Sequence, residues 1–83
     1  MKKRERFSVS VGALVHPDQK VIRLVSGNVR ILFVPMSKVN LGESRWRFEG
    51  LVKTRHGYGE RKNETPAVLE VDLKTRDGFI EYP

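Results

Sequence analysis

Two residues, Gly27 and Asn28, separate two apolar, β-branched segments and constrain this chain more than any other feature. A two-residue connection between such segments is typical of a tight β-hairpin, whose loop length fixes how the strands pair. Residues 20–26 and 29–34 should therefore form an antiparallel pair with one defined register. The expected cross-strand pairs are Ser26–Val29, Val25–Arg30, Leu24–Ile31, Arg23–Leu32, Ile22–Phe33 and Val21–Val34.

This register divides the side chains of the hairpin between two faces, because successive residues of a strand point to opposite sides. One face is wholly apolar and predicts core: Ile22, Leu24, Ile31 and Phe33. The other combines four apolar side chains with two arginines, whereas a face that meets only water should be polar. Unless Leu14 or residues 36–41 cover this second face, it is a candidate protein interface. Its residues are Val21, Arg23, Val25, Arg30, Leu32 and Val34.

Alternation of apolar and polar residues predicts further strands at residues 6–15, 45–53 and 67–75. The dipeptide Asp77-Gly78 indicates another tight hairpin, which would add a sixth strand. In that hairpin, Leu73 should pair with Tyr82 and Lys74 with Glu81. The side chains expected to face the core are Phe7, Val9, Val11, Ala13, Val15, Trp46, Phe48, Val52, Leu69, Val71 and Leu73.

Five to six strands with short connections predict a small all-β domain, an antiparallel barrel or sandwich of SH3-like or OB-like size. Residues 35–43 break the alternation and are interpreted as a loop or one short helical turn, with Pro35 at its start. The 83 residues suffice for a single domain at 6–83, preceded by a basic tail at 1–5. A long polar loop is expected at 54–66.

Composition narrows the classes of function. The chain has no cysteine, which excludes disulfides and thiolate zinc sites and fits the cytoplasm. Its two histidines lie on separate predicted loops and its carboxylates are not clustered, so neither a metal nor another cofactor is expected. No apolar run is long enough for a membrane helix, and the alternating N-terminal segment does not resemble a signal peptide.

The formal net charge is +6, and its surplus lies in the first half of the chain. Residues 1–42 hold eight basic and two acidic side chains, whereas residues 43–83 hold eight of each. Such a balance favours polyanionic or acidic partners.

The leading hypothesis is a non-enzymatic domain that binds nucleic acid, RNA or DNA, or another polyanion. Basic side chains share the outer face of residues 45–53, and a basic loop follows, in which Tyr58 could stack on a base. Glu49, Glu60 and Glu64 dilute this positive charge, and an ordinary solvated sheet face is the alternative interpretation. The predicted binding residues are Arg45, Arg47, Lys53, Arg55, Tyr58, Arg61 and Lys62.

Two other functions are weighed against this one. A protein-interaction or inhibitor module, of the type found in phages and other mobile elements, would dock on a larger protein through the second hairpin face or self-associate as a homodimer. The weakest hypothesis is a metal-free ribonuclease that uses acid–base groups of the loop. No catalytic residue is assigned, because sequence neighbours need not converge in space. The loop residues considered for it are Arg55, His56, Tyr58, Glu60, Arg61 and Lys62.

Overall fold

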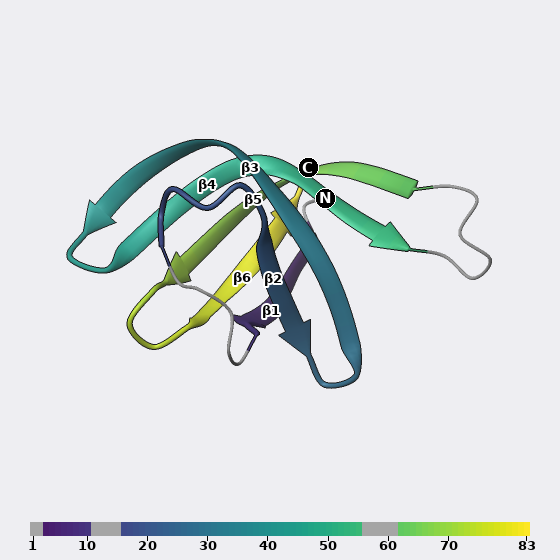
Figure 1. Cartoon of the computed structure of the whole chain (residues 1–83), viewed down its shortest axis with the longest axis horizontal. Helices are drawn as coiled ribbons and strands as arrows, with labels where there is room; N and C mark the ends of the chain where they lie inside the picture. The colour runs from purple at the N-terminus through teal and green to yellow at the C-terminus, as the bar shows by residue number, and fades with distance from the viewer. Residues whose placement is uncertain (1–2, 11–15, 56–61) are drawn as a thin grey trace.

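The computed structural model describes residues 3–10, 16–55 and 62–83, which form six antiparallel strands (Figure 1). The strands close into a barrel in chain order, because β1 pairs with both β2 and β6. The all-β prediction is confirmed, and the architecture is a barrel. None of the described residues lies in a helix, so none supplies a helix that could cross a membrane. The strands are β1 (Lys3–Val9), β2 (Ile22–Ser26), β3 (Val29–Gly42), β4 (Arg45–Arg55), β5 (Lys62–Asp72) and β6 (Asp77–Tyr82).

The interior of the barrel is filled by alternate apolar residues from all six strands. Phe33, Phe48 and Leu69 are completely inaccessible to solvent. Removing such side chains from water is the main favourable term in folding a small barrel. No polar or charged side chain is buried among those whose burial the structure describes, so the polar groups of these residues are accessible to solvent. The core residues are Phe7, Val9, Ile22, Leu24, Ile31, Phe33, Phe48, Val52, Ala67, Leu69, Val71 and Ile80.

The hairpin between β2 and β3 has the predicted register, from Ser26 opposite Val29 to Ile22 opposite Phe33. Gly27 adopts a φ of +58°, which fits the first central position of a tight hairpin turn and which glycine reaches without strain. Val21 precedes β2, so the sixth expected pair is not part of the ladder. The four residues predicted to be core on this hairpin are all buried.

The helical turn considered at 35–43 does not form, because β3 continues as a strand to Gly42 and pairs with β4. A β-bulge between Pro35 and Ser37 shifts the register, and it accommodates a proline that has no N–H for the ladder. The sequence alternation is interrupted here because the bulge inserts an extra residue. Glu43 then turns the chain toward β4 with a φ of +51°.

Gly50 makes the close packing of β3 against β4 possible. It pairs with Pro35 at the bulge and is itself buried. A Cβ placed on Gly50 would lie 2.0 Å from the carbonyl oxygen of Val34, a distance that no side chain can occupy. The close approach of β3 to β4 at the bulge therefore depends on glycine at this position of β4.

The hairpin between β5 and β6 turns earlier than predicted. Asp77-Gly78 lies inside β6, where Gly78 pairs with Val71, so the expected pairs Leu73–Tyr82 and Lys74–Glu81 are wrong. Residues 73–76 form the turn instead, and they are held by the side chain of Asp72. The Asp72 carboxylate accepts hydrogen bonds from the backbone N–H groups of Lys74 at 2.8 Å and Thr75 at 3.3 Å. Such Asp-capped turns compete with Asp-Gly turns for the same sequence.

Both segments expected to lie outside the strands are largely part of the barrel. The predicted tail at 1–5 is wrong from Lys3 onward, because β1 pairs there with β6. The predicted loop at 54–66 is too long, because the ladder between β4 and β5 extends to Arg55 opposite Lys62. Polar residues continue these strands at little cost when their side chains point to solvent. Residues 56–61 lie outside the described part of the chain.

Candidate binding faces of the barrel

The basic residues of β4 lie on its outer face, as the alternation predicts. Arg45 and Arg47 are exposed, whereas Phe48 and Val52 on the same strand face the core. Trp46 is half-buried and stacks on Phe48 with ring centroids 6.3 Å apart. The best stacking side chains of this strand are therefore on the inner side, away from any nucleic acid at the outer face.

The neighbouring strand neutralises this basic face. Each basic residue of β4 for which the structure describes the side chain lies opposite an acidic residue of β5. The Nζ of Lys53 lies 3.6 Å from the Oε1 of Glu64. Opposite charges that face each other across strands stabilise the pairing and cancel the field that a polyanion would meet. The pairs are Arg45–Asp72, Arg47–Glu70 and Lys53–Glu64.

Asp72 is held in its charged form. The hydroxyl of Ser44 donates a hydrogen bond to its Oδ1 at 2.7 Å, and the two backbone N–H groups of the turn add to it. These hydrogen bonds, the one from Ser44 foremost, lower the pKa of Asp72 below its ordinary value, and the charge of Arg45 contributes. Asp72 therefore stays ionised opposite Arg45 and also fixes the turn into β6.

The predicted nucleic-acid site includes four residues of the loop, of which the structure describes two. Arg55 and Lys62 form the last pair of the ladder between β4 and β5. Tyr58 and Arg61, with His56 and Glu60 of the ribonuclease hypothesis, lie outside the described ranges. The convergence of these loop side chains remains a prediction.

The outer face of β2 and β3 has a different character. We call it the β2–β3 face and define it by Val21, Arg23, Val25, Arg30, Leu32 and Val34. Val21 is 39% exposed and Leu32 is 40% exposed, although both are apolar. Residues 36–41 do not cover this face, since they continue β3 and Met36 is itself 75% exposed. Leu14, the other proposed cover, lies outside the described residues.

The two arginines of the β2–β3 face have no acidic neighbour across the strands. Arg23 lies opposite Leu32, and Arg30 lies opposite Val25. Both arginines are exposed, and neither takes part in the ion pairs found among the described residues. Two positive charges that no described acidic residue compensates therefore lie within an apolar surface.

Phe79 is an outward-facing aromatic residue that the sequence interpretation missed. The guanidinium carbon of Arg4 lies 4.1 Å from the centre of its ring, a cation–π contact. Arg4 also pairs with Glu81 at 3.5 Å between Nη2 and Oε2. The signal was present, because Ile80 is apolar and buried, and the residues on either side of it must then point outward.

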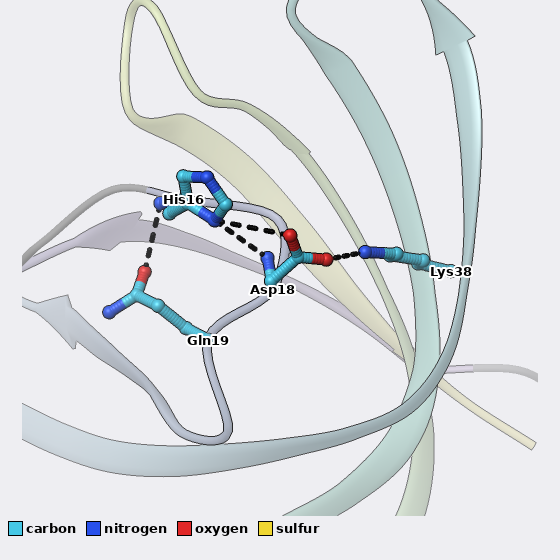
Figure 2. Close-up of polar contacts among 4 residues, drawn as sticks. All are labelled: His16, Asp18, Gln19 and Lys38. Atoms are coloured by element: carbon cyan, nitrogen blue, oxygen red, sulfur yellow. Dashed lines mark hydrogen bonds and ion pairs between the residues drawn. The ribbon is translucent and has the colours of Figure 1, made fainter.

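The only histidine in the described ranges has a structural role in a turn (Figure 2). Residues 16–19 form a turn, in which the N–H of Gln19 donates to the carbonyl oxygen of His16 at 3.2 Å. The Nδ1 of His16 accepts a hydrogen bond from the N–H of Asp18 at 3.1 Å. Lys38 of β3 binds the carboxylate of Asp18 and so ties the turn to the strand.

Described residues of four strands form a groove on the outer surface that is poor in side chains for catalysis. The groove, of about 550 Å³, crosses β3 to β6 and has mostly apolar walls, including Met36, Leu51 and Val68. Tyr82 also lines it, and burial raises the pKa of this phenol, with a further contribution from the charge of Glu5. No group of three His, Asp or Glu side chains within the described ranges could hold a metal ion.

Comparison with known proteins gives no information on function, so the functional argument rests on these faces. The chain matches no family model, and no curated protein or solved structure is significantly similar to it. The outer surface of β4 and β5 carries matched charges, whereas the β2–β3 face carries unmatched arginines among exposed apolar side chains. The second of these surfaces is the stronger candidate for binding.

Proposed function

We propose that this protein is a non-enzymatic binding module that docks on a larger protein through the β2–β3 face. The observation that carries the proposal is the pair Arg23 and Arg30, which lie among exposed apolar residues and face no acidic residue of the described strands. Arginine and apolar side chains are the usual components of the energetically important centre of protein interfaces. A strand face that meets only water should be polar, whereas this face has Leu32 at its centre.

The same observation indicates the chemistry of the partner. An apolar surface that covers Val21 and Leu32 stabilises the complex, because it removes these side chains from water. Arg23 and Arg30 can each bind a carboxylate of the partner through two parallel hydrogen bonds. The partner surface should therefore be apolar and flanked by Asp or Glu. The net charge of +6 would speed its encounter with an acidic protein. We place this function in the cytoplasm, since a chain without cysteine needs no oxidising compartment.

A matched pair of substitutions tests the proposal. Leu32→Asp puts a charge on the β2–β3 face, whereas Val29→Asp puts the same charge on the same hairpin, at a residue that is 54% exposed but lies on the other face. Wild-type, Leu32→Asp and Val29→Asp proteins would each be immobilised and exposed to nuclease-treated lysate of the source cells. We expect one protein to bind the wild type and Val29→Asp and to be lost from Leu32→Asp, with the affinity then measured by titration calorimetry.

The proposal fails if Leu32→Asp retains the protein that the wild type captures. It also fails if the protein is captured only from lysate that has not been treated with nuclease, because the bridge would then be a nucleic acid. Circular dichroism of both variants establishes that each is folded.

Polyanion binding is the second candidate, supported by the surplus of positive charge and by the two unpaired arginines. A salt titration of binding to single-stranded RNA and to a DNA duplex tests it. Affinity that falls steeply with salt would indicate phosphate contacts and give their number. No binding at low salt would exclude this candidate.

A further inference from the structure

The second half of β3 has an open edge. The ladder between β2 and β3 ends at Ile22 opposite Phe33, whereas β3 continues to Gly42. Over residues 34–42, β4 is the only described strand that pairs with β3, so no described strand lies along the other side of this segment (Figure 1). We call residues 34–42 the β3 edge. Its unpaired backbone N–H and C=O groups are a template for a further strand.

The side chains of the β3 edge are unusually apolar for an unpaired strand. Met36 is 75% exposed, Val39 is 57% exposed and Leu41 is 40% exposed. Only six large apolar residues are exposed in the described part of the chain, and three of them lie here. The edge therefore combines a backbone that can pair with apolar side chains that pairing would cover.

The β3 edge also lacks the charge that normally prevents strand addition. Soluble proteins protect open edges with charged side chains, lysine above all. Lys38 is the only charged residue of this edge. Its ammonium group binds Asp18 and lies 5.8 Å from the ring centre of Trp46, so its charge is neutralised within the same chain (Figure 2). No net charge of the edge opposes the approach of an identical one.

We propose that the β3 edges of two copies of this chain pair antiparallel across a two-fold axis at Val39. In this register Val39 meets Val39 of the second copy, and Lys38 faces Asn40. Ser37 faces Leu41 and Met36 faces Gly42, so no like charges meet. Identical edges satisfy each other's backbone groups in such an arrangement, which closes after two copies. This dimer needs no docking partner and does not depend on the β2–β3 face.

With the axis at Val39, residues 36–42 of the two copies pair. A strand pair of seven residues is a small interface, so the dimer should be reversible. Light scattering should give the monomer mass at micromolar concentration and approach twice that mass at millimolar concentration. Val39→Lys adds an uncompensated charge at the centre of the β3 edge and should hold the protein at the monomer mass. The position is exposed, so the barrel should fold, which a thermal melt verifies.

Cross-linking tests the register directly, because the natural chain has no cysteine. Directly opposed residues of an antiparallel pair have Cβ atoms about 5 Å apart, close to the separation that a disulfide needs. Val39→Cys should oxidise readily to a disulfide-linked dimer. The control is Val29→Cys, which is 54% exposed against 57% for Val39 and should cross-link at least about tenfold more slowly under the same oxidant.

The proposal is overturned if the wild type keeps the monomer mass up to millimolar concentration. It is also overturned if Val39→Cys and Val29→Cys cross-link at equal rates, or if Val39→Lys dimerises like the wild type. Each of these results would mean that the β3 edge is not where two copies meet.

Discussion

The outer surface of β4 and β5 and the β2–β3 face are both built on strands that carry arginines, yet they present opposite surroundings to them. On β4, Arg45 and Arg47 face Asp72 and Glu70 of the next strand. On β2 and β3, Arg23 and Arg30 face Leu32 and Val25. The difference shows that the net charge of a strand face depends on the residues of the neighbouring strand as well as on its own residues.

This difference has an energetic consequence. Lys53 and Glu64 form an ion pair across β4 and β5, and the charge of Arg45 helps to hold Asp72 in its ionised form. The arginines of the β2–β3 face make no such contact among the described residues. Arg23 and Arg30 are therefore available to carboxylates of a partner, whereas Arg45 and Lys53 already interact with acidic residues of β5.

The largest effect is expected from a substitution that disrupts the pairing of β3 with β4, on which both surfaces depend. In Gly50→Val, the new Cβ would lie 2.0 Å from the carbonyl oxygen of Val34 and would force β3 away from β4. We expect a loss of about 3 kcal/mol in the free energy of unfolding, measured by urea titration. Gly27→Ala is the control, since nothing lies within 4 Å of its added carbon. Its positive φ should cost only about 1 kcal/mol.

A smaller effect is expected from Asp72→Asn, which changes only the charged surface of β4 and β5. The neutral side chain accepts weaker hydrogen bonds from Ser44 and from the turn, so the melting temperature should fall by several degrees at pH 7. The substitution should leave binding through the β2–β3 face unchanged. A melting temperature equal to that of the wild type would contradict the role given to Asp72 in the turn.

The pH dependence provides a second readout for Asp72. Because its pKa is lower in the folded state than its ordinary 3.8, the ionised form stabilises the folded protein above that pH. This contribution is lost as the pH falls below 3.8 toward the folded-state pKa. Wild-type stability should therefore fall more steeply in acid than that of Asp72→Asn, as measured by thermal melts from pH 6 to the acid limit of folding.

The smallest effect separates the arginines of the two surfaces by their contribution to stability. A double-mutant cycle of Arg47→Ala and Glu70→Ala should give a coupling free energy of roughly 0.5 kcal/mol, because these residues face each other. Arg23→Ala should leave the free energy of unfolding unchanged within error. A coupling of zero for Arg47 and Glu70 would show that the charges of β4 are as available for binding as those of the β2–β3 face.

The parts of the fold that could be predicted are those that a short connection determines. Gly27-Asn28 leaves only one register for β2 and β3, so both faces of that hairpin follow from the sequence. The bulge at Pro35 could not be foreseen, because an inserted residue and the end of a strand break the alternation in the same way. Asp77-Gly78 was misleading because the side chain of Asp72 forms a turn four residues earlier.

The same distinction, between what the local pattern predicts and what strand register determines, applies to the candidate surfaces. The outward orientation of Arg45, Arg47 and Lys53 follows from period-two alternation alone. Their neutralisation does not, because it requires the register between β4 and β5, which a longer connection leaves open. The open edge of β3 likewise depends on where β2 stops pairing, at Ile22, and on a bulge that keeps β3 extended beyond that point.

The most direct test of the central claim compares two variants with equal charge. Arg23→Gln with Arg30→Gln and Arg45→Gln with Arg47→Gln each lower the net charge by two from +6. Calorimetric titration of both variants with the captured partner should show at least about a tenfold loss of affinity for the first and a change within about twofold for the second. Equal losses, or a larger loss for Arg45→Gln with Arg47→Gln, would contradict the assignment of binding to the β2–β3 face.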